Sequence, residues 1–385
     1  MRKLVIWNDP RYRAWFFQIL AVLLVGGFFA TVIANTVDNL NQLNVASGFS
    51  FLQHTAGFGI SQTLIEYSEA STYGRAFLVA LLNTLLVAGI GIVFATVLGF
   101  LVGIARLSTN WLVAKLATVY IETFRNIPLL LQILFWYTAV LSNLPAPRES
   151  MEFGGMLLNK RGLYLPAPVS EAGFEYVMLA FAAALLGVIC LRRLSERRRM
   201  RTGVGLPVFY PGFGIVLGLP LLVFWLAGSP LHFEAPQLRG FNFAGGLRAV
   251  PELLALVFAL SIYTASFIAE IVRSGIQAVN WGQSEAALAL GLRRLEILRL
   301  VVIPQALRVI IPPLTSQFLN LTKNSSLAAA LAYPELASVF AGTVLNQTGQ
   351  AVEVLAITMA VYLSLSLLTS LAMNFYNSRI ALVER

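Results

Sequence analysis

The sequence predicts an all-α polytopic membrane protein with about eight transmembrane helices. Of its 385 residues, 58% are hydrophobic and only 12% are charged, and the mean hydropathy is +0.76. Soluble domains carry about 25% charged residues. Several apolar stretches of this chain approach the roughly 20 residues that a helix needs to cross a bilayer. The basic residues gather in short segments between those stretches, which is typical of membrane proteins.

Eight apolar segments are long enough to be spans. They are expected near 15–34, 77–104, 126–144, 174–191, 207–227, 251–272, 304–322 and 354–375. The first follows a basic N-terminus, so a cleaved signal peptide is an alternative, although its apolar stretch of about 20 residues exceeds an ordinary signal-peptide core. The seventh is the least apolar, because it holds Arg308 together with Pro304, Pro312 and Pro313. Neighbouring helices would have to satisfy its freed backbone groups.

The distribution of lysine and arginine predicts the orientation of the chain. The run RRLSERRRMR at 192–201 has six arginines and one glutamate, so we place it in the cytoplasm. Each span takes the chain to the other side of the membrane, so eight spans put both termini and the segment 273–303 on the same side as this run. Of the 27 basic residues, 19 fall in segments assigned inside, seven in segments assigned outside and Arg308 within a span. Two long outer segments remain, 35–76 and 145–173, and we expect the second to be irregular because it is rich in Pro and Gly.

The composition argues against several kinds of site. Cys190 is the only cysteine, which excludes a disulfide within the chain. His54 and His232 are the only histidines and lie far from it in sequence, so no metal site is expected. None of the four lysines follows a glycine, so the chain lacks the P-loop that holds ATP phosphates. We therefore expect neither a cofactor nor ATP hydrolysis here. The net charge of +9 would suggest nucleic acid for a soluble protein, but basic residues clustered in loops favour membrane topology.

The stretch 282–304, GQSEAALALGLRRLEILRLVVIP, is unusually charged for this chain. Ser284 is expected to cap a helix that carries Glu285 near its positive end. Gly291 is expected to end that helix with a positive φ angle. An amphipathic second helix follows and gives way to the seventh span at Pro304. On these grounds alone the stretch is either a helix pair that lies on the lipid surface or a protruding knob that binds a partner.

The same stretch resembles the EAA loop of ABC importer permeases. Glu-Ala-Ala is followed after three residues by Gly291, and after nine more by Val-x-Ile-Pro, where the family has Ile-x-Leu-Pro. Three flanking segments resemble the polar amino acid uptake permeases, the HisM-like group that includes histidine, glutamine and general amino acid transporters. These segments are YTASFIAEIVRSGIQAVNWGQSEAA (263–287), YIETFRNIPLLLQILFWY (120–137) and LTKNSSLAAALAYPEL (321–336).

The resemblance implies a type I ABC importer (MetI-like) permease core over 77–385. Within it, 145–250 would be an insert that contains the fourth and fifth spans, and 282–303 would be the cytoplasmic coupling loop. Residues 1–76 would form an N-terminal tail, a first span and a periplasmic loop. Long inserts and an extra N-terminal span are most similar to the permeases of general L-amino acid systems.

The resemblance also implies partners. Two cytoplasmic ATPase subunits would carry ATP and Mg, a second homologous permease would complete a heterodimer, and a periplasmic amino acid-binding protein would deliver substrate at the inner membrane. Transport would proceed by alternating access. The residues implied in coupling to the ATPase are Gly282, Glu285, Ala286, Ala287, Gly291 and Pro304. Which amino acids are carried stays open.

Polar groups in or near the spans are candidates for the substrate path. They are Asn83, Thr84, Arg125, Asn126, Glu270, Asn320, Lys323, Asn324, Ser325 and Ser326. Some have plainer alternatives: Arg125 could anchor a helix end, Asn83 could bond a neighbouring helix and Glu270 could pair with Arg273. Lys323 would suit the carboxylate of an amino acid, a hypothesis that unchanged uptake by Lys323→Ala would contradict.

Two other functions are weighed against this interpretation. An ion-coupled secondary amino acid transporter would need acids within the membrane, and mid-span carboxylates are scarce here. An integral-membrane enzyme would need paired catalytic acids, a Ser/His arrangement or an HExxH motif, and the sequence offers none of these.

Overall fold

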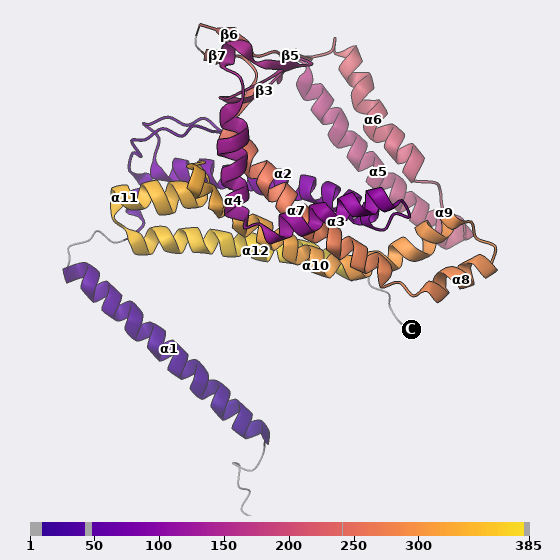
Figure 1. Cartoon of the computed structure of the whole chain (residues 1–385), viewed down its shortest axis with the longest axis horizontal. Coiled ribbons are helices and arrows are strands. Elements are labelled where there is room, and N and C mark those ends of the chain that lie inside the picture. The colour runs from indigo at the N-terminus through magenta and orange to yellow at the C-terminus, as the bar shows by residue number, and fades with distance from the viewer. Residues whose placement is uncertain (1–9, 43–47, 241, 381–385) are drawn as a thin grey trace, which may run out of the picture. The chain divides into compact units, whose positions relative to one another are not determined.

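The computed structural model describes residues 10–42, 48–240 and 242–380, and helices account for most of them (Figure 1). The helices are α1 Pro10–Gln42, α2 Tyr73–Arg106, α3 Trp111–Asn126, α4 Leu129–Leu134, α5 Phe174–Thr202, α6 Phe209–Leu226, α7 Pro251–Gln277, α8 Trp281–Ala289, α9 Arg294–Ile297, α10 Ile303–Asn324, α11 Leu345–Thr348 and α12 Ala351–Ile380. Three π-helical stretches, Phe135–Val140, Leu298–Val302 and Ala337–Val344, and a 3-10 turn, Ser325–Leu331, extend several of them.

Seven helices in the described part of the chain are long and apolar enough to cross a membrane. An eighth span arises if α3 and the helical segment 129–143 are counted together, although the two meet at an angle of 105°. The bend has a local cause. Ile127 precedes Pro128 and adopts an extended conformation (φ −94°, ψ 127°), as residues before proline usually do. The expected polytopic helical fold is confirmed.

α3 is a helix that hydropathy alone did not predict. Its N-cap is Asn110, whose side-chain oxygen accepts hydrogen bonds from the backbone N–H groups of Leu112 and Val113. Its outward side chains include an exposed Trp111, whereas Ile121 is fully buried. An amphipathic helix of this kind has too low a mean hydropathy to resemble a span.

The chain divides into two units, and the first comprises the described residues up to 130 and from 259 onward. Close approaches of small residues pack its helices. A Cβ added to Gly99 on α2 would lie 2.6 Å from the Cβ of Ile268 on α7, and one added to Gly103 would lie 2.7 Å from the carbonyl oxygen of Ala269. Small residues at helix contacts let backbones pack tightly inside a membrane.

The second unit, 131–258, contains all eight strands of the described residues. They are β1 Met151–Phe153, β2 Met156–Asn159, β3 Gly162–Leu165, β4 Ala167–Ser170, β5 Leu231–Glu234, β6 Gln237–Arg239, β7 Asn242–Ala244 and β8 Leu247–Ala249. An antiparallel sheet has the order β1-β2-β3-β8, and β4–β5 and β6–β7 form two-stranded pairs.

The expectation of irregular structure over 145–173 is therefore wrong. The Gly pair that suggested it forms a tight hairpin, because Gly154 (φ +57°) and Gly155 (φ +82°) occupy the two turn positions between β1 and β2. A two-residue hairpin with two positive φ angles favours glycine. The ring of Tyr164 on β3 then packs on Phe243 on β7, with centroids 4.2 Å apart.

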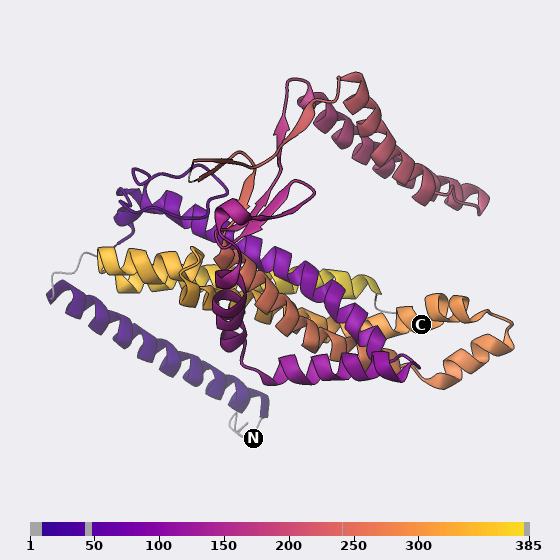
Figure 2. The same cartoon turned by 45° about the horizontal axis from the view of Figure 1, so that its top comes forward.

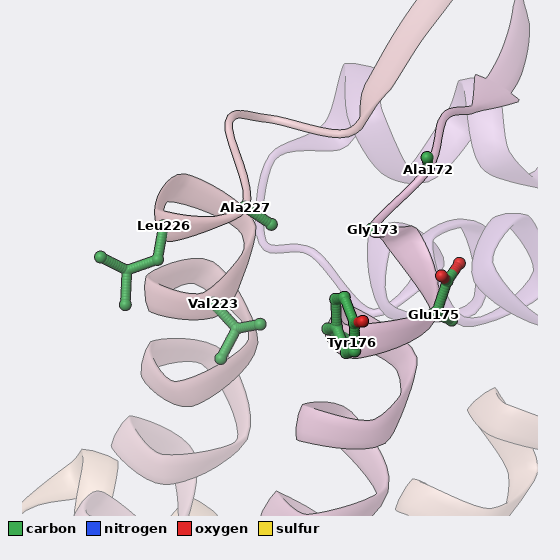
Figure 3. Close-up of a pocket in the computed structure, with 7 residues that line it drawn as sticks. All are labelled: Ala172, Gly173, Glu175, Tyr176, Val223, Leu226 and Ala227. Atoms are coloured by element: carbon green, nitrogen blue, oxygen red, sulfur yellow. The ribbon is translucent and has the colours of Figure 1, made fainter.

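α5 and α6 form a helical hairpin in the same unit, and both views show them side by side (Figures 1 and 2). Gly212 on α6 packs against Val188 on α5. The pairing of β4 with β5 joins the two helices at one end. At that end lies an open cleft lined by Glu175 and Tyr176 of α5, by Val223 and Leu226 of α6 and by Ala227 directly after it (Figure 3).

Candidate functional site

The charged stretch forms a helix–turn–helix that begins earlier than its sequence suggested. Asn280 is the N-cap of α8, and its side-chain oxygen accepts a hydrogen bond of 2.9 Å from the backbone N–H of Gly282. The expectation that Ser284 caps this helix is wrong, since Ser284 lies in its first full turn. Both residues are good caps, but Asn280 has the extended backbone that the position requires. Glu285 is consequently an exposed residue within α8.

Gly291 ends α8 as predicted, with φ at +82°. Its N–H donates to the carbonyl of Leu288 at 2.9 Å, and the N–H of Leu292 donates to the carbonyl of Ala287 at 3.2 Å. This pair of bonds is a Schellman motif. Nothing lies within 4 Å of a Cβ added to Gly291, so the backbone conformation rather than space requires glycine. A side chain there costs about 1–2 kcal/mol.

The second helix runs into a membrane span without a break. The N–H of Arg293 donates to the Glu296 carboxylate at 2.8 Å and starts α9. α9 continues through the π-helical stretch Leu298–Val302 into α10, with Pro304 in the first turn of α10. Proline lacks an N–H to donate to the preceding turn, and this is consistent with the π-helical stretch directly before it. Residues 294–331 thus form one helical path from the turn into the span.

The surface of this helix pair carries large exposed apolar side chains among its charged ones. Trp281, Leu290 and Leu295 are 75%, 83% and 75% exposed, whereas Ala287 and Ile297 are buried between the helices. Of the remaining predicted coupling residues, Gly282, Ala286 and Gly291 are exposed and Pro304 is half-buried. We call residues 280–304 the knob. Exposed apolar side chains in one place indicate a binding surface.

A second cluster of polar groups is buried inside the first unit. Asn83 and Thr84 on α2 are fully buried. The Asn83 amide donates to the carbonyls of Gln62 (2.8 Å) and Pro334 (2.9 Å), and the Thr84 hydroxyl accepts from the N–H of Leu336 at 3.0 Å. These bonds fix an interruption of the helical path at 332–336. The Asn83 side-chain oxygen has no hydrogen-bond partner among the described residues.

Glu335 lies in this interruption and was not singled out from the sequence. Its carboxylate is fully buried and accepts hydrogen bonds from the N–H groups of Ala337 (2.8 Å) and Ser338 (2.7 Å) and from the Tyr362 hydroxyl (2.6 Å). The sequence did hold a signal, since Glu335 directly follows Pro334 in an apolar stretch. Proline ends a helix and leaves backbone N–H groups without partners, and a carboxylate at that place can accept their hydrogen bonds. We call Asn83, Thr84, Glu335 and Tyr362 the buried cluster.

The candidates at the end of α10 divide between the interior and the surface. Ser325 is buried near the Tyr362 hydroxyl and donates its own hydroxyl to the carbonyl of Thr322 at 2.7 Å. Lys323 and Asn320 are exposed, and Asn324 and Ser326 are half-buried. Only Ser325 of this group joins the buried cluster.

Glu270 belongs to an ion cluster at the opposite end of α2. Glu270 on α7 is paired with Arg273 one turn along and with Arg106 on α2, which confirms the expected Glu270–Arg273 pair. The Arg106 side chain also lies 3.8 Å from Glu122. Arg106 is 22 positions from Thr84 on one continuous helix, or about 33 Å, so the candidates do not form one site.

Arg125 and Asn126 lie at the end of α3 and are exposed. The Arg125 guanidinium sits 5.1 Å from the centroid of the Phe267 ring, a cation–π contact that holds α3 against α7. The Asn126 amide donates to the carbonyl of Glu122 at 2.7 Å. The geometry therefore gives Arg125 a role in helix packing and Asn126 a role in ending its own helix.

Comparison with known proteins identifies the family. YhdX of Escherichia coli (strain K12), whose name carries a provisional assignment as an amino-acid ABC transporter permease, is 57% identical over 98% of this chain and 96% of its own. The general L-amino acid transport system permease protein AapQ of Rhizobium johnstonii is 55% identical over 98% of this chain and 94% of its own. The glutamate/glutamine/aspartate/asparagine transport system permease protein BztB of Rhodobacter capsulatus is 42% identical over 98% and 96%.

The family model for the binding-protein-dependent transport system inner membrane component matches residues 91–382. That range contains the knob, the helical path from it and the break at Glu335. The chain is thus a multi-pass membrane protein that belongs to the family of binding-protein-dependent transport system inner membrane components.

Proposed function

We propose that this chain is the membrane-spanning permease subunit of an ATP-driven importer for L-amino acids. The observation that carries the proposal is the knob, a helix–turn–helix with exposed apolar and charged side chains that is continuous with a span, in a chain of this family. The chain has no P-loop, so the energy comes from ATP and Mg held by two separate ATPase subunits at the cytoplasmic face. A second, homologous permease and a periplasmic amino acid-binding protein complete the assembly.

The proposed substrate class rests on the relatives. AapQ is named for general L-amino acids, and BztB for glutamate, glutamine, aspartate and asparagine. Because the substrates named for BztB include both acids and amides, we do not expect a substrate site that recognises a single side-chain charge. We propose that 77–385 forms the permease core with 145–250 as its insert, in the inner membrane and with both termini in the cytoplasm.

The knob suits coupling because of how it is attached. ATPase closure would displace α8 and α9, and α9 leads without a break through α10 to Leu331. Directly beyond lies the interruption held by the buried cluster. Movement at the cytoplasmic surface therefore reaches the interior of the membrane along one helical path. Alternating access needs such a connection between the energy source and the substrate path.

The test is co-purification of the tagged chain from its native membrane, with mass spectrometry of the bound proteins. Gly291→Asp should remove the ATPase, because it strains the Schellman turn and adds a negative charge beside the exposed Leu290. Gly203→Asp is the matched control, since Gly203 also ends a helix with a positive φ (+76°) and has open space around it. An ATPase retained equally by both variants contradicts the coupling role. A chain that purifies alone in every case favours an ion-coupled transporter.

A further inference from the structure

The α5–α6 hairpin carries features of a lipid-facing element with defined boundaries. Its helices pack on each other, while outward side chains such as Leu186 (67%) and Leu221 (62%) are exposed. Exposed aromatic residues lie near both ends, with Tyr176 and Trp225 at the β4–β5 end and Tyr210 at the other. Tyr and Trp at such positions mark the two membrane–water interfaces.

α5 continues past the second boundary while α6 does not. α5 has 29 residues and α6 has 18. The stretch from Tyr176 to Leu191 covers about 23 Å of bilayer, and the following turns from Arg192 to Thr202 extend about 15 Å further. Gly212 on α6 packs against Val188 on α5, so the aromatic boundary at Tyr210 lies level with the start of this extension, which therefore lies in and beyond the layer of lipid headgroups. The extension contains all six arginines of the basic run.

Three of these arginines form a row on one face. Arg193, Arg197 and Arg201 are four positions apart, and side chains with that spacing lie above one another on a helix. Together with Glu196 and Met200 they line a shallow groove. Successive members are about 6 Å apart along the axis. We call these three residues the arginine row.

The arginine row points away from the rest of the hairpin. The opposite face carries Ser195, which is buried and donates a hydrogen bond of 2.9 Å to the carbonyl of Leu206 in the α5–α6 connection. Arg199 is on that side too, because it borders Gly205 of the same connection. The connection thus covers one face of the α5 extension and leaves the arginine row facing outward.

The charges of the arginine row are not neutralised within the described residues. The one carboxylate nearby, Glu196, pairs with Arg192 at 3.4 Å. No Asp or Glu oxygen of the described chain lies within ion-pairing distance of Arg193, Arg197 or Arg201. Guanidinium groups bind phosphate oxygens with two parallel hydrogen bonds each. Lipid phosphates offer such oxygens, and they lie at the depth of the headgroups.

We propose that Arg193, Arg197 and Arg201 form a binding site for the phosphate of an anionic phospholipid in the cytoplasmic leaflet. The leaflet assignment rests on the orientation in the proposed function. The groove accepts the headgroup, and the apolar side of α5 below it accepts the acyl chains. Binding fixes the depth of the hairpin in the bilayer.

The experiment measures lipid binding to the full chain purified in detergent, by native mass spectrometry with added phosphatidylglycerol. The test variant is Arg193→Gln/Arg197→Gln/Arg201→Gln. The control, Arg192→Gln/Arg198→Gln/Arg199→Gln, removes the same charge from the same helix but spares the arginine row. We expect the apparent Kd for phosphatidylglycerol to rise about tenfold or more in the test variant and by less than about twofold in the control. Zwitterionic phosphatidylethanolamine should bind all three proteins alike.

Three results would overturn the site. An equal loss in both variants would mean general attraction of a basic helix to anionic lipid, and no loss in either would mean no binding. Displacement of the lipid by millimolar inorganic phosphate would identify a free-anion site. These measurements need no ATPase, so a chain that purifies without one refutes the proposed function and leaves the lipid result standing. Normal lipid binding by Gly291→Asp is expected for the same reason.

Discussion

Glu335 shows how one residue can organise the interior of a span. Burial of a carboxylate is costly unless its oxygens are hydrogen-bonded, and three donors from two elements reach this one. The Tyr362 hydroxyl is the donor that ties the interruption at 332–336 to α12. The carboxylate therefore holds together two segments that are close in space only after folding.

Tyr362→Phe removes that donor and should lower the free energy of unfolding by about 1–3 kcal/mol, because a buried acceptor loses a partner. Thermal unfolding of the purified chain in detergent checks it. Tyr376→Phe on the same helix is the control, since Tyr376 is 51% exposed and should tolerate the change. If the two variants unfold at the same temperature, the Tyr362 bond contributes nothing to stability.

Single residues also show where sequence reasoning succeeds and fails. The turn at Gly291 was predictable, because a Schellman motif is a local arrangement with a strong glycine preference. The start of α8 was not predictable, since Asn280 and Ser284 are both good caps and only the backbone conformation determines which of them is the N-cap. Glu335 was missed for a different reason. Its burial depends on packing with α2 and α12. Asn83 on α2 is 251 positions from Pro334, and Tyr362 on α12 is 27 positions from Glu335.

Among the helices and strands, too, some were predictable from the sequence and others were not. Long apolar helices were predictable because length and hydropathy define a span. α3 was missed because an amphipathic helix has low mean hydropathy, and the short strands of 145–173 were missed because Gly and Pro were taken for irregular structure. In both cases the secondary structure of the segment depends on which other segment packs against it.

The contact of α2 with α7 depends on glycine at particular positions, so two glycines of α2 should respond differently to alanine. Gly99→Ala places a methyl group 2.6 Å from the Cβ of Ile268, whereas Gly89 has nothing within 4 Å. Gly99→Ala should force the helices apart and destabilise the fold by about 1–3 kcal/mol. Gly89→Ala should be neutral or stabilise it by up to about 1 kcal/mol, because alanine favours helix. Unfolding midpoints in detergent measure both, and a loss at Gly89 equal to that at Gly99 would contradict the packing argument.

For the molecule as a whole, the proposed orientation in the membrane rests on the arginine bias, and one labelling experiment tests it. In a Cys190→Ser background, Met200→Cys should react with a membrane-impermeant maleimide only after permeabilisation. Gln237→Cys should react in spheroplasts, because it is exposed at the β4–β5 end of the hairpin. Cys190 is the only native cysteine, so the background is simple to make. The reverse labelling pattern would invert the topology and remove the knob from the ATPase side.

The helical path from Arg294 to Leu331 has a mechanical consequence. Its 38 residues make a lever about 57 Å long. Pivoting about Ile310, which is 21 residues and about 32 Å from Leu331, a tilt of about 5° would carry the far end sideways by about 3 Å. The fulcrum is set by Gly275, where an added Cβ would collide with Ile310. A contact this close allows two helices to pivot on each other with little sideways slip, so a stroke at the knob reaches the segment beside Glu335 at roughly the same size.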